Sequence, residues 1–394
     1  MNGARGTARP KVSPINDPRW RSAIIQILLC LVVAWLAYSA ITNAVDNLAR
    51  ARIASGFDFW NSTAGFDISQ TLIPYTTQST YGRAFWVGLL NTLLVASLGI
   101  VLATIIGFAI GILQLSKNPL VSRLAATYVE IIRNLPLLLQ LLFWYNAVLK
   151  ALPNLRESVA IPGGALLNNR GLFLPKPIFG GAFDAVLIAC GLGVIGALAF
   201  RIWAHRRQAV TGQQSPVFVV SILLIVGLPI AVFAAAGFPV TFDRPEMGRF
   251  NIRGGIEILP EFAALLFGLS IYTAAFIAEV VRAGIQAVSQ GQTEAAYSLG
   301  LRPGPTLRLV VIPQAMRVIV PPLTNQYLNL TKNSSLAVAI GYPDLVQVFT
   351  GTVLNQTGQA VEVVAITMAV YLTISLVTSG LMNLYNRRFA LRER

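Results

Sequence analysis

The chain has 394 residues, of which 55% are hydrophobic and only 12% are charged, and its mean hydropathy is +0.65. Ordinary globular proteins carry about 25% charged residues and disordered chains are more polar still, so this composition excludes both classes. Lys and Arg exceed Asp and Glu by 30 to 16, which gives a net charge of +14. These basic residues are spread thinly between apolar stretches. A nucleic-acid-binding surface is therefore excluded, because such surfaces cluster their basic groups.

Stretches without Asp, Glu, Lys or Arg mark the segments that can cross a bilayer, which takes about 20 helical residues. Eight such stretches predict an all-α, multi-pass membrane protein with about eight transmembrane helices. In chain order they are 22–45, 84–116, 134–149, 185–200, 208–242, 262–278, 318–340 (in which Lys332 is the one charged residue) and 363–386.

The distribution of charge predicts the orientation of these helices. With the N-terminus inside, 18 Lys and Arg residues fall on the inner side and 10 on the outer side, and the net charges are +14 and −1. An excess of Lys and Arg marks the cytoplasmic side, so both termini are predicted to be cytoplasmic. A cleaved signal peptide ending near Thr42, Asn43 and Ala44 is the alternative for the first stretch, although its apolar part is long for one.

Two long segments are predicted to lie outside the membrane on the outer face. Segment 47–81 is polar, and segment 154–181 is rich in Gly and Pro, whose turn chemistry predicts irregular structure. The two apolar stretches that follow contain no charged residue. A transport pathway usually needs polar groups within the membrane, so these two stretches are predicted to be lipid-facing or packing helices.

Segment 279–317 is the most informative part of the chain. It predicts a short helix over 292–299, a turn at Gly300, and a second short helix from Thr306. Gly300 suits the position after a helix C-terminus, where the left-handed conformation is common. The segment is otherwise compatible with an ordinary amphipathic cytoplasmic loop.

Local signals support these helix limits. Ser289 or Thr293 can cap the first helix, and Pro303 and Pro305 are expected to stop it. Small residues at 295–296 keep one face of the helix flat, so another protein surface can approach it closely.

This segment resembles the EAA motif of ATP-binding-cassette importer permeases. The matching residues are Glu294, Ala295, Ala296, Gly300, Ile312 and Pro313. In that family the loop forms coupling helices that insert into a cleft of each ATP-hydrolysing subunit. Ile312 departs mildly from the usual Leu before the final Pro.

Two further segments resemble the polar amino-acid permeases, the histidine/glutamate/glutamine/arginine/opine family. Segment 128–142 matches their Glu-x-x-Arg pattern through Glu130, Arg133, Pro136 and Gln140. Segment 313–336 matches the part after the coupling helices, with Lys-Asn-Ser-Ser in place of the commoner Lys-Asp-Thr-Ser. The chain looks most like a broad-range L-amino-acid or glutamate/glutamine permease subunit with an enlarged N-terminus.

The resemblance implies a type I importer permease core over 84–386, interrupted by an insertion at 153–257 that carries two extra helices. A cytoplasmic tail at 1–23 and an extra helix with an outer loop at 24–83 come before this core. A basic tail at 387–394 follows it.

It also implies a transport subunit of the bacterial inner membrane with no ATPase site of its own. The implied partners are a dimer of ATP-binding subunits, a paralogous second permease and a periplasmic amino-acid-binding protein. This chain needs no cofactor, since ATP and Mg would be bound by the partner subunits. All five lysines lack the Gly-Lys-Ser/Thr context of a phosphate-binding loop, in agreement with this assignment.

Ionisable residues within spans usually face a bundle interior or a cavity. Glu130 and Arg133 are three residues apart and so share one helix face. Arg133 is a candidate to receive a substrate carboxylate, helped by a helix break at Pro136. A Glu130–Arg133 ion pair near the inner interface is the equal alternative.

The segment around Lys332 is the second candidate for the pathway, or else for a subunit interface. Pro321 and Pro322 are expected to break its helix and free carbonyl groups toward a cavity. The complete set of predicted pathway residues is Glu130, Arg133, Pro136, Gln140, Asn325, Lys332, Ser334 and Ser335.

No catalytic or metal site is predicted. Cys30 and Cys190 lie in separate apolar stretches and His205 is the only histidine, so their spacing supplies neither a metal site nor a nucleophile–base pair. An ion-driven secondary transporter is the alternative function, but the two halves show no paired broken helices. A membrane scaffold without transport activity would leave the coupling segment unexplained.

Overall fold

The computed structural model describes residues 18–50, 56–249 and 251–389, so most of both predicted basic tails lies outside the described residues. The chain divides into two compact units. The terminal unit comprises Met1–Leu94 and Pro343–Arg394, and the central unit comprises Val95–Tyr342. Helix α2 (Tyr81–Gln114) contributes its first part to the terminal unit and its last part to the central unit.

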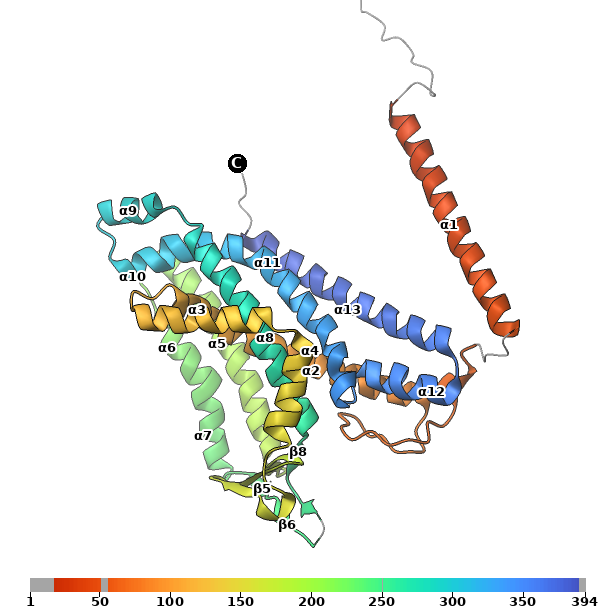
Figure 1. Cartoon of the computed structure of the whole chain (residues 1–394). Helices are drawn as coiled ribbons and strands as arrows, with labels where there is room; N and C mark the ends of the chain where they lie inside the picture. Colours follow the sequence, from red (N-terminus) through yellow and green to blue (C-terminus); the bar gives the residue numbers. More distant parts are fainter. Residues whose placement is uncertain (1–17, 51–55, 250, 390–394) are drawn as a thin grey trace, which may run out of the picture. The chain divides into compact units, whose positions relative to one another are not determined.

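The central unit is mainly helical (Figure 1). After α2 its helices are α3 (Pro119–Asn134), α4 (Leu137–Leu142), η2 (Phe143–Leu149), η3 (Leu155–Glu157), α5 (Phe183–Thr211), α6 (Val217–Ile222), η4 (Leu223–Gly227), α7 (Leu228–Ala235), α8 (Pro260–Gln286), α9 (Gln290–Ser298), α10 (Pro303–Thr306), η5 (Leu307–Val311), α11 (Ile312–Asn333) and η6 (Ser334–Ile340). Segments η2, η4 and η5 are π-helical turns that continue their neighbouring α-helices, whereas η3 and η6 are 3₁₀ helices.

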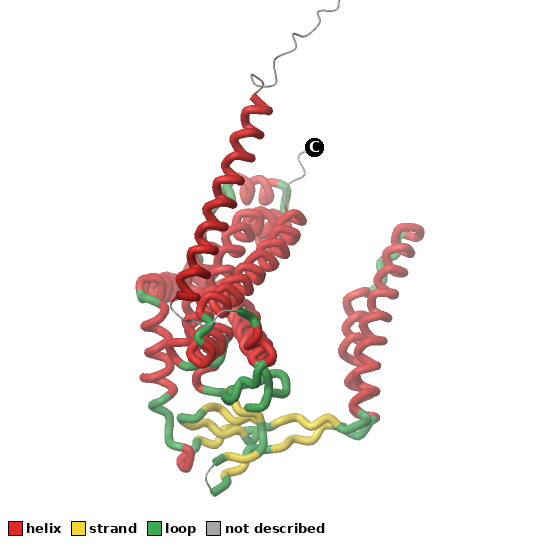
Figure 2. The backbone as a smooth tube through the Cα atoms, turned by 90° about the vertical axis from the view of Figure 1, so that its right-hand side faces the viewer, coloured by secondary structure: helices red, strands yellow, loops and turns green. Residues whose placement is uncertain are grey.

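The central unit also contains eight short strands, which the prediction of an all-α fold did not include. They are β1 (Val159–Ile161), β2 (Ala165–Asn168), β3 (Gly171–Leu174), β4 (Lys176–Phe179), β5 (Val240–Asp243), β6 (Glu246–Met247), β7 (Ile252–Arg253) and β8 (Ile256–Ile258). They form an antiparallel sheet in the order β1-β2-β3-β8 and two separate pairs, β4 with β5 and β6 with β7. These strands and their turns, the strand layer, gather at one end of the unit (Figure 2).

The strand layer corrects the prediction of irregular structure over 154–181. The Gly and Pro residues of that segment make the turns between short strands. Gly163 and Gly164 adopt φ values of +100° and +88°, which a tight turn between Ile161 and its partner Ala165 requires. Along β3, buried and half-buried side chains alternate as a sheet with one covered face demands.

Helix α8 is the centre of the central unit. Of its 18 most apolar residues, 61% are buried, and small side chains allow its neighbours to approach closely. A Cβ added to Gly268 would lie 2.5 Å from Leu141 of α4, and one added to Gly107 of α2 would lie 2.6 Å from Ile277 of α8. Helix α8 thus packs closely against α2 and α4, and at Gly107 a larger residue would meet the stiff Ile277 side chain and the Ala274 carbonyl.

The inserted helices, α5 and the continuous α6–η4–α7, form a hairpin that begins and ends at the strand layer. Only 22% of the most apolar part of α5 and 6% of that of Val217–Ala235 are buried. The two helices touch where Gly193 meets the backbone of Leu224. Their apolar, exposed surfaces agree with the prediction of lipid-facing helices.

The terminal unit contains α1 (Pro18–Arg50), η1 (Asp58–Asn61), the start of α2, η7 (Val346–Val353), α12 (Leu354–Thr357) and α13 (Ala360–Phe389). The predicted polar loop after α1 is ordered over its described part, because Phe59 and Ile68 are buried in a shared core with Phe85 and Phe349. Rings in this core meet edge to face or tilted, with centroids 5.2 Å apart for Phe85 and Phe349.

Buried polar groups fix the chain path in the terminal unit. Asn91 donates to the carbonyls of Gln70 and Pro343, both at 2.9 Å. Asp344 lies before η7 and accepts a hydrogen bond from the Gln347 N–H at 2.8 Å, as an N-cap does. Tyr371 of α13 donates to the second Asp344 oxygen.

Within the described residues, seven helices are long and apolar enough to cross a bilayer, and α3 with α4–η2 forms an eighth, bent candidate. The predicted number of spans is confirmed. The third predicted stretch, 134–149, is only the second arm of that bent pair, whose two arms meet at an angle of 104°.

Candidate functional site

Helix α9 begins at Gln290, two residues before its predicted start. Ser289 occupies its N-cap position without the predicted side-chain capping hydrogen bond, whereas the C-terminal turn forms as the sequence predicts. The helix ends at Ser298 with Leu299 as its C-cap, and Gly300 follows with φ of +76°. The Gly300 N–H donates to the Tyr297 carbonyl at 2.9 Å, and the Leu301 N–H donates to the Ala296 carbonyl at 3.1 Å. These two bonds define the Schellman motif, which satisfies the last carbonyls of a helix. The predicted role of Gly300 is confirmed.

The start of the second short helix is corrected. It begins at Pro303, not at Thr306, and continues through η5 into α11. Pro303 therefore does not stop α9, which has already ended, but opens α10. A proline at the first helical position is favourable because its missing N–H would have no partner there.

The six residues of the EAA-like motif are not equivalent. Ala296 is buried, whereas Glu294, Ala295 and Gly300 are exposed on α9 and its turn. Gln292 of α9 and Gln314 of α11 share a side-chain hydrogen bond of 3.1 Å. Farther along, Ile312 is exposed and Pro313 is half-buried at the start of α11.

Two exposed residues of this segment were missed by the sequence reasoning. Leu299 is 83% exposed and Tyr297 is 49% exposed. Helix α9 stands at one end of the central unit, opposite the strand layer (Figure 1). Both side chains are available for contact with another protein.

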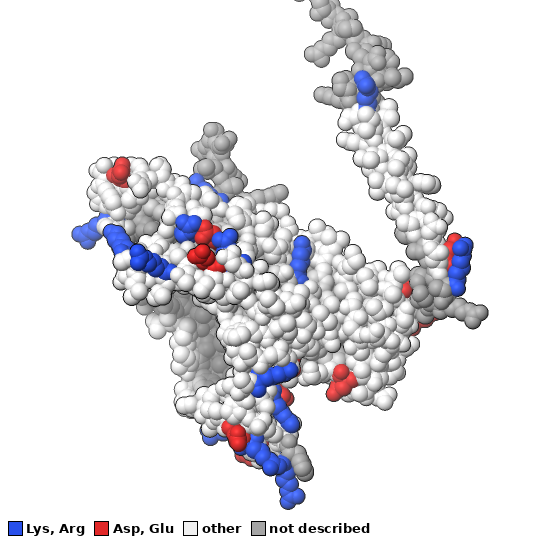
Figure 3. All heavy atoms as spheres, viewed as in Figure 1, with Lys and Arg blue, Asp and Glu red and all other residues white. Residues whose placement is uncertain are grey.

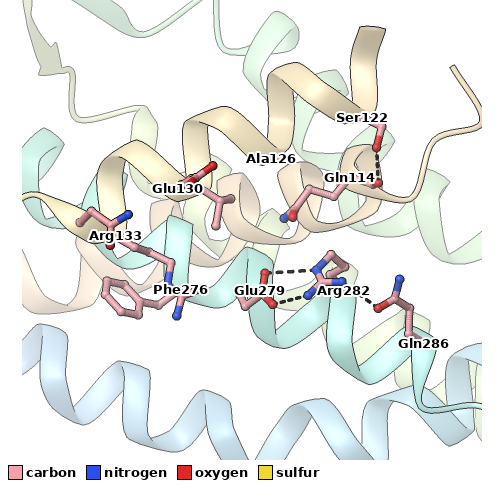
Figure 4. A pocket seen from close by; sticks show the side chains of 11 residues that line it. Gln114, Ser122, Ala126, Glu130, Arg133, Phe276, Glu279, Arg282 and Gln286 are labelled. Carbon is pink, nitrogen blue, oxygen red and sulfur yellow. Dashed lines mark hydrogen bonds and ion pairs between the residues drawn. The ribbon is translucent and has the colours of Figure 1, made fainter. Parts of the chain in front are cut away.

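The second candidate site is a polar pocket of about 610 Å³ between the end of α2, α3 and the last part of α8 (Figure 4). Eleven residues line it: Gln114, Ser122, Ala126, Val129, Glu130, Arg133, Asn134, Phe276, Glu279, Arg282 and Gln286. Glu130 and Arg133, predicted from sequence, are among them.

Local sequence positions α3 beside this pocket. Asn118 caps its N-terminus by accepting the Leu120 N–H at 2.9 Å. The helix ends before Pro136, because a residue that precedes proline disfavours the helical conformation; Leu135 is extended, with φ −96° and ψ 131°. Helix α4 then departs in a new direction.

The charged groups of the pocket are arranged in an unexpected way. Glu279 and Arg282 of α8 form an ion pair, in which Nε donates to Oε2 at 3.1 Å, and Arg282 also donates to Gln286 at 2.8 Å. The Arg133 guanidinium lies over the Phe276 ring, 5.2 Å from its centroid. Within the described chain no ion pair joins Glu130 to Arg133. The structure therefore does not contain the Glu130–Arg133 ion pair that was the alternative prediction.

One polar atom of the pocket has its hydrogen-bonding capacity unused. The Gln114 Nε2 group is buried and has no hydrogen-bond partner in the described structure. The carbonyl of the same residue accepts from Ser122 at 2.7 Å. Among the described residues, the pocket therefore offers one free amide donor, one guanidinium on an aromatic ring and one carboxylate outside any ion pair, Glu130.

Gln140, another predicted pathway residue, lies at the bend between α3 and α4. Its buried amide donates to the carbonyls of Ile132 and Leu135, each at 3.0 Å. It therefore closes the C-terminus of α3, whose last carbonyls have no partner within the helix. Pro136 is exposed at the same bend.

The remaining predicted pathway residues form a separate group. Asn325 and Lys332 are exposed on α11, and the Ser334 and Ser335 hydroxyls donate to backbone carbonyls one turn earlier, at 2.8 and 2.7 Å. None of these four lines the polar pocket. The structure thus separates residues that the sequence grouped.

The expected helix break at Pro321 and Pro322 is wrong. Both residues lie inside α11, which continues to Asn333. A proline removes one intrahelical hydrogen bond, but packing can hold the helix together across the gap. Here Ile319, Val320 and Leu323 are buried around the two prolines.

Glu279, Arg282 and Phe276 are pocket residues that sequence reasoning did not select. The available signal was the spacing: Glu279 and Arg282 repeat the three-residue interval of Glu130 and Arg133 at the end of another apolar stretch.

Comparison with known proteins agrees with this architecture. Residues 192–391 match the family model described as "Binding-protein-dependent transport system inner membrane component". The chain is 53% identical over 389 residues to the general L-amino acid transport system permease protein AapQ of Rhizobium johnstonii, and the match covers 99% of this chain and 97% of the relative.

Two further relatives also match over nearly their whole length. The putative amino-acid ABC transporter permease protein YhdX of Escherichia coli is 50% identical over 394 residues, all of both chains. The glutamate/glutamine/aspartate/asparagine transport system permease protein BztB of Rhodobacter capsulatus is 43% identical, over 96% of each chain. The chain therefore belongs to the family of binding-protein-dependent transport system inner membrane components, and it is a multi-pass permease subunit of an ABC transporter.

Proposed function

We propose that this chain forms part of the translocation pathway of an ATP-driven importer for L-amino acids, with a general range that includes polar ones. The observation that carries the proposal is the 53% identity, over 99% of the chain, to a permease of a general L-amino acid transport system. The other two relatives are also named for amino-acid transport.

The proposed complex contains a second, paralogous permease, a dimer of ATP-binding subunits and a soluble amino-acid-binding protein. In it ATP and Mg are bound by the ATPase subunits, and this chain contributes no catalytic residue. The exposed apolar residues Tyr297 and Leu299 support contact of α9 with an ATPase subunit. The EAA-like residues around Gly300 would fix the conformation of α9 and its turn, and so the position of Tyr297 and Leu299.

The proposed orientation places both termini and α9 in the cytoplasm. The Lys and Arg excess supports it, since the inner face would carry +14 and the outer face −1. Chain order adds a constraint. The strand layer comes before α8 and α9 comes after it, so a membrane-spanning α8 puts them on opposite sides.

The polar pocket is the proposed site where substrate passes this subunit. An amino acid carries one carboxylate and one ammonium group, and the pocket offers Arg133 with the free Gln114 amide for the first and Glu130 for the second. Arg133 lies over Phe276 and not in an ion pair, so it is available to a carboxylate. Lys332, with Asn325, is proposed to line a different part of the pathway.

Co-purification of the ATPase tests the coupling role. Glu294→Lys reverses the exposed charge of α9, and Gly300→Asp places a side chain where φ is +76°. We expect each variant to lose the ATPase or to uncouple ATP hydrolysis from uptake. Gly304→Asp is the matched control, because Gly304 has an ordinary φ and open space around it.

The outcome separates the alternatives. Retained coupling in both variants would contradict the proposed role of α9. Uptake that needs an ion gradient and no ATPase would instead support a secondary transporter.

A further inference from the structure

The strand layer contains a second polar pocket, of about 720 Å³. Three guanidinium groups reach it from three separate segments: Arg156 from η3, Arg170 from the turn between β2 and β3, and Arg249 from the turn between β6 and β7. Glu157 also lines it, so its charged residues sum to +2. Arg156, Arg170 and Arg249 are called the arginine pocket below.

Hydrogen bonds around Asn168 and Asn169 fix the two segments that carry Arg156 and Arg170. Asn168 is only 1% exposed. Its amide donates to the Ser158 hydroxyl at 3.0 Å, and its oxygen accepts the Arg170 N–H at 2.8 Å. Asn169 donates to Asn154 at 3.1 Å and so joins the same turn to the segment before η3. Arg156 and Arg170 are thus brought together by a polar network between their segments and not by their own side-chain interactions.

None of the three arginines forms an ion pair in the part of the chain that the structure describes. All three are exposed. Like charges held near one another repel, so this arrangement is stabilised most when an anion enters the pocket.

The location of the pocket suggests what that anion belongs to. Charged side chains gather over the strand layer and over the opposite end of the central unit, which carries α9 (Figure 3). Seven of the ten Lys and Arg residues assigned to the outer side lie in this layer or in the segment just before it: Lys150, Arg156, Arg170, Lys176, Arg244, Arg249 and Arg253. Basic residues in short outer loops oppose the topology rule, so their concentration here calls for another role.

We propose that the arginine pocket docks an acidic, carboxylate-bearing surface of the soluble amino-acid-binding protein that delivers substrate to this permease. The inference rests on the proposed importer function and orientation. The three arginines come from three separate segments and are exposed at the surface of the pocket. Exposed charges of this kind act at protein interfaces by steering association and selecting the partner.

The test uses the complete transporter in liposomes with the purified binding protein of the same system, saturated with its amino acid. The variant Arg156→Gln/Arg170→Gln/Arg249→Gln removes the arginine pocket. The control Lys176→Gln/Arg244→Gln/Arg253→Gln removes the same charge from the same layer without touching the pocket. The half-maximal concentration of binding protein for stimulation of ATP hydrolysis is measured at low and high salt.

We expect the pocket variant to raise the half-maximal concentration at least about tenfold at low salt and to lose most of its salt dependence, while the control changes it less than about twofold. Hydrolysis without binding protein should stay unchanged in both, which separates docking from folding. An unchanged half-maximal concentration in the pocket variant would overturn the proposal.

Two other results would also overturn it. Equal defects in both variants would show a general effect of charge, and a defect seen only with anionic phospholipid in the liposomes would assign the pocket to lipid headgroups. Failure of the wild-type complex to respond to any binding protein would instead count against the importer function itself.

Discussion

Helix α8 and the inserted hairpin differ in how the hydropathy of a helix relates to the fraction of it that is buried. The α6–η4–α7 span, Val217–Ala235, has the highest mean hydropathy of the candidate spans, yet only 6% of its most apolar part is buried. Helix α8 is less apolar, but 61% of the corresponding part is buried, and most of its own buried residues are Gly, Ala, Ser or Thr. In a bilayer, lipid tails are as apolar as Leu, so burial follows close packing of small side chains and not hydropathy.

The two regions also differ in polar chemistry. Helix α8 carries the Glu279–Arg282 ion pair at the edge of the polar pocket. The inserted hairpin has no charged residue in its apolar cores, and its charges sit at its ends and in the strand layer. We therefore expect substitutions around α8 to affect folding and transport, and matched substitutions in the hairpin to affect neither.

The largest expected effect is from Gly107→Val. The new Cβ would lie 2.6 Å from the Ile277 Cβ and 3.0 Å from the Ala274 carbonyl, so α2 and α8 would have to separate. We expect a loss of about 3 kcal/mol, the upper end for overpacking. The measurement is thermal unfolding of the detergent-purified complex. The control is Gly191→Val on α5, where nothing lies within 4 Å of the added Cβ. Equal losses of stability in the two variants would contradict the expected difference between α8 and the hairpin.

Next comes Gln140→Met, which keeps the side-chain volume and removes both hydrogen bonds to the Ile132 and Leu135 carbonyls. Leaving these groups unsatisfied should cost about 2 kcal/mol. Thermal unfolding would report the loss, and cysteine cross-linking across the α3–α4 bend would report its loosening. The control is Gln208→Met, at an exposed position of α5. A stable Gln140→Met protein would mean that Pro136 alone sets the bend.

Transport itself separates the regions in a third experiment. We expect Arg133→Gln and Lys332→Met each to reduce amino-acid uptake about tenfold, as the loss of a charged hydrogen bond does, while the complex still assembles. Arg201→Gln, on exposed α5, should leave uptake unchanged. Normal uptake by Arg133→Gln would return that residue to a structural role, and normal uptake by Lys332→Met would remove α11 from the pathway.

The smallest expected effect concerns pH and the strand layer. Partial burial and the neighbouring Glu261 raise the pKa of Glu257 above its ordinary 4.5, while Arg170 opposes the shift. A raised folded-state pKa gives stability that is present below pH 4.5 and lost as the pH rises through the folded value. Amide exchange in β3 and β8 should therefore accelerate with pH beyond its intrinsic dependence.

Glu257→Gln should flatten this extra dependence, because an amide does not ionise. Glu246→Gln, in the same layer on β6, is the control. Identical profiles for Glu257→Gln and the unmodified protein would assign the dependence to another group.

Local signals account for what sequence analysis predicted well. Gly300 was assigned correctly because a left-handed residue after a helix is a property of a few consecutive residues. The spans followed from long uncharged stretches in the same way. The strands were missed because each has only two to four residues, and because two of the pairings, β3 with β8 and β4 with β5, join segments far apart in the chain, such as Phe173 with Glu257.

The candidate pathway shows the limit of such reasoning. Glu130 and Arg133 were selected because charge within an apolar stretch is costly. Their actual neighbours, Glu279 and Phe276, lie about 150 residues away in sequence and on another helix. Gln140 was selected for the same polarity, but its amide is used to close a helix end.

The sequence by itself determined that the chain is a multi-pass membrane protein, how many spans it has, and that α9 is a short helix ending at a glycine. Each depends on residues adjacent in the chain, whose hydropathy and backbone preferences act locally. Tertiary structure alone decided that α8 is central and the more apolar hairpin is peripheral. It also decided that Arg133 meets Phe276 and that three arginines share one pocket. These depend on packing between distant segments, which no local preference encodes.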